Sequence, residues 1–275
     1  MTFAARENYA LLRTQHEYRR LALQGELLKP MTRRCFAEAG IMPGMRVLDL
    51  GAGAGDVCLL LAEMVGPSGH VTGIDLDQGA LEFAGGRTAA FDNITLVEGD
   101  FHEYVPAQPF DAVVGRYVLL YQTDPAAALA AATRHLRPGG SVAFLEPWFM
   151  LPPAGSENLT QRIGWLIIET LRRSGAHIDM GPRLYRTFTE AGLPGPSLNM
   201  ELVMDGSPDS PLYQVIADTF VSTLPRAIAY GLAAEGEFDT AAIPAIFKAT
   251  LSHLGYAASI LPTVMAWCKT PARGK

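Results

Sequence analysis

The chain has 275 residues, 49% of them hydrophobic and 18% charged, and its formal net charge is −6. A net acidic chain whose basic residues form only short pairs is not expected to bind nucleic acid. The sequence has no run of about 18 apolar residues to span a membrane, and early charges at Arg6 and Glu7 argue against a signal peptide. Three well-separated cysteines predict free thiols and no paired metal ligands. We therefore expect a cytoplasmic protein without a bound metal.

The N-terminal part of the chain is predicted to be helical. Apolar residues recur at intervals of three and four over residues 7–28, which predicts an amphipathic helix that ends near Pro30. A second short helix is predicted over residues 32–39, because Gly40 follows it and Pro43 lies just beyond. These helices precede the part of the chain that is expected to form the core.

From Met45 onward, short apolar runs alternate with helical periodicity. The predicted strands are, in chain order, residues 46–50, 71–75, 94–97, 111–115 and 141–146. The intervening helices are predicted over residues 56–65, residues 77–90, and from Asp124-Pro125 to the glycines after Pro138. This repetition predicts a doubly wound, Rossmann-like α/β fold, with a mostly parallel sheet that helices cover on both faces.

After Glu146 this alternation ends. Helices are predicted over residues 158–173, 184–191, 211–232 and 239–254, and strands over residues 198–204 and 260–268. An antiparallel hairpin at the edge of the sheet, with helices inserted in its connection, accounts for this order. The helical insertions, at about residues 150–182 and 207–256, are expected to form lids.

A glycine-rich turn follows the first predicted strand. Asp49 lies near the end of the strand, and Gly51, Gly53 and Gly55 follow it. Glycines let a ligand approach the backbone closely. A dinucleotide fingerprint would place its third glycine at the position of Asp56. The turn therefore favours a nucleoside ligand without a pyrophosphate, which points to S-adenosylmethionine rather than NAD.

Polar and aromatic residues follow the other predicted strands at the same edge of the sheet. Asp75 ends the second strand, where a carboxylate can accept hydrogen bonds from ribose hydroxyls. Asp100 and Phe101 follow the third strand and suit an exocyclic amine and a purine ring. Arg116 follows the fourth strand and Glu146 the fifth. Each residue alone could cap a helix or pack in the core, but their common register indicates a ligand site.

These motifs strongly resemble those of class I S-adenosylmethionine-dependent methyltransferases, and most of all the ubiquinone/menaquinone-biosynthesis type. The resemblance covers about residues 40–150. The matching stretches are Gly44-Met45-Arg46-Val47-Leu48-Asp49-Leu50-Gly51-Ala52-Gly53-Ala54-Gly55, Gly73-Ile74-Asp75-Leu76-Asp77, Glu98-Gly99-Asp100-Phe101, Phe110-Asp111 and Leu136-Arg137-Pro138-Gly139-Gly140. Ala52 departs from the Cys or Thr that is frequent in the family.

The resemblance implies a seven-stranded sheet whose last strand is antiparallel, with S-adenosyl-L-methionine as the cofactor. The cofactor-binding residues that it implies are Asp49, Gly51, Gly53, Gly55, Asp75, Leu76, Asp100, Phe101, Arg116, Tyr18, Arg20 and Gln24. Tyr18, Arg20 and Gln24 resemble residues that some relatives fold over the cofactor. An exposed helix surface is the alternative for these three.

Candidates for catalysis and acceptor binding lie near the later strand ends and in the lids. The catalytic candidates are His177, Tyr117 and Glu146, and the substrate-binding candidates are Tyr121, Trp148, His177 and Phe220. A positioned base could hold off a proton if the acceptor is a hydroxyl. Packing alone is the alternative for Tyr121, Trp148 and Phe220.

The sequence therefore predicts a methyltransferase that acts by in-line displacement on O, N or C of a small, aromatic or otherwise apolar metabolite. Residues 1–40 would cover the cofactor, and residues 41–275 would form the methyltransferase domain with its lid insertions. The alternative is a protein of this fold that binds S-adenosylmethionine without methyl transfer, and a dehydrogenase is a distant third. The expected partner is a small-molecule methyl acceptor, with neither nucleic acid nor membrane. The sequence does not decide between a monomer and a homodimer.

Overall fold

The computed structural model describes residues 9–150 and 158–272. Residues 7 and 8 of the predicted 7–28 helix lie outside the described residues, as does the segment that links the fifth strand to the first lid helix. Residues 9–14 are not helical, because the helix begins at Gln15 with Thr14 as its N-cap. Seven strands form one sheet in the order β3-β2-β1-β4-β5-β9-β6. Their bounds are β1 Arg46–Leu50, β2 His70–Asp75, β3 Ile94–Glu98, β4 Phe110–Arg116, β5 Leu136–Pro147, β6 Ser197–Glu201 and β9 Thr263–Lys269.

The sheet is parallel except for one strand. β1 to β5 pair in parallel, whereas β9 is antiparallel to both of its neighbours, β5 and β6. The predicted doubly wound fold with an antiparallel strand at the edge region is therefore confirmed. Because the crossovers bring the carboxyl ends of the parallel strands to one edge, every motif in the loops after these strands meets there.

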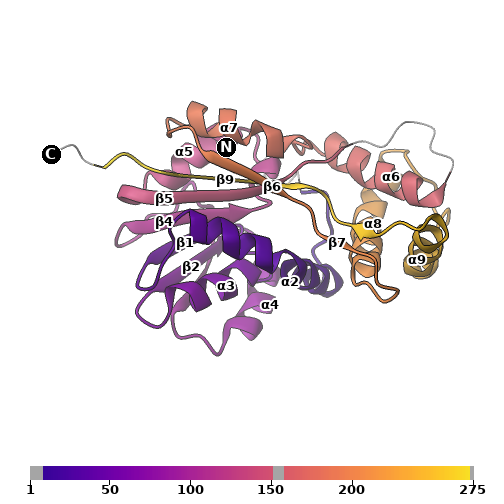
Figure 1. Cartoon of the computed structure of the whole chain (residues 1–275), viewed down its shortest axis with the longest axis horizontal. Coiled ribbons are helices and arrows are strands. Elements are labelled where there is room, and N and C mark those ends of the chain that lie inside the picture. The colour runs from indigo at the N-terminus through magenta and orange to yellow at the C-terminus, as the bar shows by residue number, and fades with distance from the viewer. Residues whose placement is uncertain (1–8, 151–157, 273–275) are drawn as a thin grey trace.

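Helices cover both faces of the sheet (Figure 1). One face carries α2 Gln15–Glu38, α3 Asp56–Val65 and α4 Gln78–Thr88, and the other carries α5 Pro125–Thr133 and α7 Met180–Glu190. Within β1, Val47 packs with the first group, whereas Leu48 and Leu50 pack with the second. An apolar run buried on both faces is typical of a parallel strand.

Helix α2 corrects the prediction of two separate helices, because it continues through Pro30 as one helix of 24 residues. A proline inside a helix removes one backbone hydrogen bond and strains the preceding turn. Here Leu28, Met31 and Phe36 on both sides of Pro30 are almost fully buried in the core. Tertiary packing of one apolar face keeps the helix continuous.

Three helices lie beyond the carboxyl ends of the strands, and we call them the lid helices (Figure 1). They are α6 Leu159–Arg173, α8 Leu212–Ala229 and α9 Ile243–Leu254, the last preceded by the short η2 Thr240–Ala242. They have their own hydrophobic cluster, which includes Leu166, Phe220 and Phe247. Among the described residues, no helix combines the length and the hydrophobicity that a membrane span requires.

The two predicted late strands are each shorter in the structure. The first ends with β6 at Glu201, and the short β7 Met204–Asp205 follows it. The second begins with β9 at Thr263, and the short β8 Ala258–Ser259 lies before the predicted range. β7 and β8 form a separate two-stranded sheet. Pro262 lies in the break before β9, and a proline cannot donate a hydrogen bond to a ladder. The break lets the chain leave the sheet for the lid helices.

Other element boundaries also differ from the prediction, those of α7 and β5 among them. Helix α7 begins at Met180 rather than at residue 184, because Pro182 is accommodated in its first turn. Strand β5 begins at Leu136 rather than at residue 141, and its pairing with β4 shifts register between Phe110 and Ala112. Neither difference moves a residue at the carboxyl edge of the sheet.

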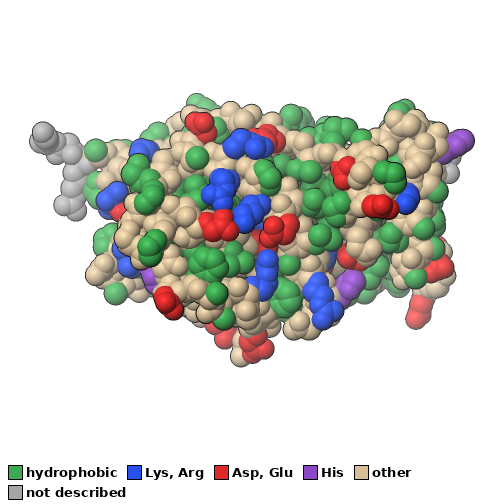
Figure 2. All heavy atoms as spheres, turned by 60° about the horizontal axis from the view of Figure 1, so that its bottom comes forward, with side chains coloured by type: hydrophobic (Ala, Val, Ile, Leu, Met, Phe, Trp, Pro, Cys, Tyr) green, Lys and Arg blue, Asp and Glu red, His purple; other side chains and the backbone are tan. Residues whose placement is uncertain are grey.

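Charged side chains of both signs lie side by side on the face shown in Figure 2. Glu63 of α3 pairs with Lys29 and Arg33 of α2, and Arg34 of α2 pairs with Glu201 of β6. These pairs are largely exposed, so each contributes little to stability. The position of α2 depends mainly on its buried face.

Gly25 of α2 packs against the first residue of α3, and this contact is testable. A Cβ at Gly25 would lie 2.3 Å from Cγ of Asp56, the first residue of α3. We expect Gly25→Ala to lower the free energy of unfolding by about 1–3 kcal/mol, because the helices must separate. Gly86→Ala in α4 is the control, because a Cβ there meets nothing within 4 Å and alanine should stabilise the helix by up to about 1 kcal/mol. Urea denaturation measures both, and a stabilising Gly25→Ala would contradict the expected contact.

Candidate active site

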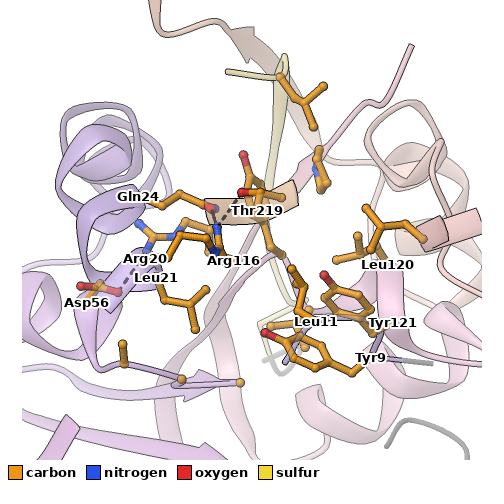
Figure 3. Close-up of a pocket in the computed structure, with 18 of the residues that line it drawn as sticks. Tyr9, Leu11, Arg20, Leu21, Gln24, Asp56, Arg116, Leu120, Tyr121 and Thr219 are labelled. Carbon is orange, nitrogen blue, oxygen red and sulfur yellow. Dashed lines mark hydrogen bonds and ion pairs between the residues drawn. The ribbon is translucent and has the colours of Figure 1, made fainter. Parts of the chain in front are cut away.

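One cavity of about 550 Å³ lies between the carboxyl edge of the sheet and the lid helices. We call its two parts the strand end and the lid end. The strand end is formed by residues in the turns after β1, β2, β3 and β4 and by the first turns of α2. The lid end is formed by α6, α8, α9, the β8–β9 link and the segment around Tyr9. Figure 3 shows the cavity with residues of both ends pointing into it.

The three glycines after β1 have different surroundings. Gly51 and Gly53 line the cavity, whereas Gly55 caps the start of α3 behind it. A Cβ at Gly51 would lie 2.7 Å from Cγ2 of Val118. A Cβ at Gly53 would approach only the carbonyl oxygen of Gly51, at 3.8 Å, and Gly53 has a φ of +50°. Gly53 therefore leaves open space in the cavity wall, as a ligand that approaches the backbone requires.

Asp75 connects the turns that follow β1 and β2. Its Oδ2 accepts a hydrogen bond of 2.8 Å from the N–H of Gly53, and its Oδ1 accepts one of 2.9 Å from the N–H of Asp77. Burial raises the pKa of Asp75, while these backbone N–H groups act in the opposite direction. Leu76 also lines the cavity. The carboxylate is thus held at the position where the sequence predicts contact with a ribose.

Asp77 is a cavity residue that the sequence argument did not include. It accepts hydrogen bonds of 3.1 Å from the hydroxyl of Tyr18, and it caps α4 by accepting from the N–H groups of Gly79 and Ala80. Its contact with Tyr18 joins the start of α2 to the end of β2. The sequence does contain a signal for this role, because Asp77 follows two residues after Asp75 at the end of the same strand.

Three arginines line the cavity at its strand end: Arg13, which lies 3.8 Å from Asp77, and the pair Arg20 and Arg116. Arg20 forms a bidentate pair with Glu17, with distances of 2.9 and 2.6 Å, and also contacts Gln24 and Thr219. Figure 3 shows Arg20, Gln24 and Arg116 close together on the wall. Two guanidinium groups at a partly enclosed wall can bind an anionic group such as a carboxylate.

Arg116 is held by groups on two helices. It donates a hydrogen bond of 3.3 Å to Oγ1 of Thr32, and it lies 3.9 Å from Asp56, which also pairs with Arg87 at 2.6 Å. Burial raises the pKa of Asp56, whereas the two arginines act against that rise. Asp56, the residue that replaces the third glycine of a dinucleotide fingerprint, therefore positions an arginine.

The alternative of an exposed surface does not hold for the start of α2. Only 5% of Tyr18 and 3% of Arg20 is exposed, and both line the cavity together with Gln24. Contact of this helix with a ligand stays a prediction, since the structure shows only that these side chains line the same cavity as Gly53 and Asp75.

Asp49 and Asp100 do not line the cavity, although their neighbours do. Asp49 is buried beneath the glycine turn, where it accepts a hydrogen bond of 3.1 Å from the thiol of Cys58. Burial raises the pKa of Asp49 to about 7. Asp100 accepts hydrogen bonds from the backbone N–H and the ring of His102, whereas Phe101 faces the cavity.

The end of β4 adopts an unusual backbone conformation. Tyr117 has a φ of +60°, the only positive φ of a residue other than glycine in the described part of the chain. Its hydroxyl shares a hydrogen bond of 2.6 Å with Oγ1 of Thr263. A bulky residue in this region is strained and must be held by its surroundings.

Glu146 supplies part of that support and lies behind the cavity wall. Its carboxylate accepts hydrogen bonds from the N–H groups of three successive residues in and before the short helix η1 Leu119–Tyr121: Val118 at 3.0 Å, Leu119 at 2.7 Å and Leu120 at 3.2 Å. It is fully buried, and burial raises its pKa to about 8. The structure thus gives Glu146 a positioning role, in place of the predicted contact with reacting atoms.

Comparison with known proteins identifies the family. Residues 41–192 match the family described as "Methyltransferase domain". The chain belongs to this family. Demethylmenaquinone methyltransferases of Staphylococcus aureus strains are 38% identical over 120 residues, which is 43% of this chain and 49% of theirs. The chain thus spans about half the length of the curated relatives it matches.

Solved structures of the same fold include enzymes with different names. A putative methyltransferase from Bacillus halodurans superposes with a TM-score of 0.56 at 17% identity, covering 88% of this chain and 99% of that one. The [4+2]-cyclase SpnF gives a TM-score of 0.53 at 19% identity, with coverages of 89% and 81%. These likenesses agree with the predicted methyltransferase fold.

Three of the predicted site residues are not among those that line the cavity. His177 is held by the carbonyl oxygen of Gln122 at 3.0 Å and by Arg183 at 3.3 Å. Trp148 lies half-buried next to the β5–β9 pairing. Phe220 is fully buried and packs edge-on against Phe238. The geometry thus gives these three side chains packing or loop contacts.

The cavity is instead lined by Tyr9, an aromatic residue that was not predicted for the site. Tyr9 packs edge-on against the predicted residue Tyr121, with ring centroids 4.9 Å apart, and both rings line the lid end (Figure 3). Burial raises the pKa of both hydroxyls, as it does for Tyr117. All three are therefore neutral donors near pH 7.

Within the described residues, no cluster of three or more His, Cys, Asp or Glu side chains could hold a metal.

Glu146→Gln tests the support of the β4 turn. A glutamine amide keeps one acceptor oxygen but places an NH₂ donor against backbone donors. We expect the free energy of unfolding to fall by about 1–3 kcal/mol, as measured by urea denaturation. Glu98→Gln, at the exposed end of β3, should leave stability unchanged within about 0.5 kcal/mol. Equal effects of the two substitutions would contradict the support that Glu146 provides.

Asp49 makes stability depend on pH in a defined direction. Its pKa is raised to about 7 in the folded protein, so between about pH 4 and pH 7 the folded state holds a proton that the unfolded state has lost. The free energy of unfolding therefore falls as the pH rises through this window. Asp49→Asn removes this contribution, so the variant should lose less stability than the wild type between about pH 5 and pH 7. Denaturation at each pH tests this, and equal slopes would exclude it.

Proposed function

We propose that this protein is an S-adenosylmethionine-dependent methyltransferase whose acceptor is a small, uncharged and largely apolar molecule, methylated on O, N or C. The observation that carries the proposal is the continuity of the cavity. A glycine turn with acids and arginines forms one end, and apolar lid helices form the other. This arrangement suits a polar donor and an apolar acceptor that meet in one enclosed space.

The residues of the strand end fit the proposed donor. The open wall at Gly53 accommodates close approach to the backbone, and the held carboxylate of Asp75 offers acceptors for hydroxyls. Arg20 and Arg116 suit the carboxylate of the methionine part, and Phe101 suits the purine ring. S-adenosylmethionine would supply an electrophilic methyl group on a sulfonium.

The contribution of the chain itself is positioning and the exclusion of water. Holding two reactants in line can account for about 7–11 kcal/mol of a barrier. Helix α2 closes the strand end through the Tyr18–Asp77 contact, and α6, α8 and α9 close the lid end. The neutral hydroxyls of Tyr117 and Tyr121 can donate hydrogen bonds to an acceptor, but they do not act as bases near pH 7.

This proposal also gives a role to each part of the chain. Residues 1–40 would cover the donor, and residues 41–275 would form the methyltransferase domain, with lids inserted at about 150–182 and 207–256. The described part of the cover contacts the lid helix α8, because the hydroxyl of Thr219 lies 3.3 Å from Arg20. The curated relatives are named for demethylmenaquinone, but their match covers under half of this chain, so the proposal leaves the acceptor's identity open.

A second candidate is a reaction that uses this fold without methyl transfer. The likeness to a [4+2]-cyclase supports it, because that enzyme shares the fold and a similar extent of chain. Turnover of S-adenosylmethionine labelled in its methyl group, incubated with a metabolite extract, separates the two candidates. Label in a new product supports methyl transfer. Binding of the donor without any labelled product supports the second candidate.

Asp75→Ala tests where the donor binds. We expect calorimetric titration to show that S-adenosylhomocysteine binds this variant at least about tenfold more weakly than the wild type, because a held carboxylate is lost. Asp92→Ala removes an exposed acid in the turn before β3, at the opposite edge of the sheet from Asp75, and should bind as the wild type does. If the wild type does not bind S-adenosylhomocysteine at millimolar concentration, the proposed function is wrong.

A further inference from the structure

The lid end contains a glycine in the middle of helix α6. The residues through which α6 lines the cavity recur at intervals of three and four, so they form one face of the helix. They are Thr160, Gly164, Ile167, Ile168 and Leu171. Helix α6 joins the hydrophobic cluster of the lid through Ile163, Leu166, Ile167 and Leu171, of which the last two also line the cavity. Gly164 lies on this cavity face, one turn before Ile167 and Ile168.

Packing does not require a glycine at this position. A Cβ at Gly25 of α2 would lie 2.3 Å from Asp56, and one at Gly181 of α7 would lie 2.8 Å from Val264. A Cβ at Gly164 would meet no atom of the described residues within 4 Å. A helical glycine lowers helix stability relative to alanine. Gly85 of α4 is equally open, but it does not line the cavity. Gly164 thus lies inside a helix, lines the cavity and has free space beside its Cα.

The wall around Gly164 is suited to an apolar group. Of the described residues that α6, α8 and α9 contribute to the cavity, none is charged. The hydroxyl of Thr160 already donates to Oδ1 of Asn158 at 2.7 Å, and that of Thr219 donates to the carbonyl oxygen of Val215 at 2.7 Å. A charged group placed here would lose its hydration without a partner. An apolar group would gain from burial.

We propose that the face of α6 at Gly164 is a subsite for an uncharged alkyl or aryl part of the acceptor, and that Gly164 sets the size of the group accepted. The identification of the bound molecule as a methyl acceptor rests on the proposed function. The subsite itself depends only on the shape and polarity of the lid end.

A series of 4-alkylphenols, from methyl to octyl, tests the subsite directly by calorimetry without any donor present. Affinity for the wild type should increase with chain length. Gly164→Leu places a side chain in the free space, so the longest members should bind at least tenfold more weakly while 4-methylphenol binds as before. Gly85→Leu is the matched control and should bind the whole series as the wild type does.

Gly164→Ala shows whether the space beside this residue is free. Its melting temperature should rise, as should that of Gly85→Ala, because both substitutions favour the helix without a clash. A fall for Gly164→Ala alone would mean that packing requires the glycine, and it would overturn the proposal. A flat affinity series for the wild type, or unchanged binding of the long alkylphenols by Gly164→Leu, would also overturn it.

The subsite and the proposed function can fail separately. If the alkylphenol results hold but S-adenosylhomocysteine does not bind the wild type, the subsite stands and the methyltransferase proposal falls. If S-adenosylhomocysteine binds while Gly164→Leu leaves the alkylphenol series unchanged, the subsite falls and the proposed function stands. Donor affinity should be equal in Gly164→Leu and the wild type, because Gly164 lies at the lid end.

Discussion

The carboxylate of Asp75 joins three parts of the molecule that come from separate regions of the chain. Its two oxygens accept hydrogen bonds from Gly53, in the turn after β1, and from Asp77, after β2. Asp77 in turn accepts a hydrogen bond from Tyr18 at the start of α2. Because these groups are largely buried, each bond also satisfies a polar group that would be costly to leave unpaired. The shape of the strand end therefore depends on one short network.

The lid end depends on a different kind of interaction. The sheet has one hydrophobic cluster on each face, and the lid helices have a third that includes Leu212 and Ile243. Because the lid has its own core, it can cover the carboxyl edge of the sheet and still leave a cavity between them. The cavity is the space left between two bodies that are each packed internally, so its walls can differ in polarity. This difference allows a polar and an apolar ligand to share one enclosure.

Between the two ends lies the strained turn after β4. The positive φ of Tyr117 directs the chain into η1, whose backbone N–H groups are bound by the buried carboxylate of Glu146. Strain of this kind persists when surrounding contacts outweigh it. Here the same contacts place Tyr117 and Tyr121 on the cavity wall. The acid is thus needed for geometry, and its burial keeps it away from any ligand.

The local sequence was sufficient to predict the sheet and part of the strand end of the cavity, although Asp49, Gly55 and Asp100 do not line it. Parallel strands buried on both faces have a recognisable apolar pattern, and the residues after them meet at one edge because of the handedness of the crossovers. Gly53, Asp75, Phe101 and Arg116 were predicted together for this reason, and all four line the cavity. The continuous α2 was missed because long-range packing outweighs the local effect of Pro30. The later start of β9 was missed although Pro262 directly precedes it.

Only the tertiary structure decided which of the remaining candidates face the cavity. His177, Trp148 and Phe220 have the chemistry of site residues but do not line it, whereas Tyr9 and Gly164 do. The lid helices have apolar residues on more than one side, so their periodicity does not show which side packs into the lid core. Their orientation is set by contacts with residues more than a hundred positions away, such as that between Thr219 and Arg20. The sequence thus determined part of the strand end, through local motifs at strand ends, and the tertiary structure alone determined the lid end.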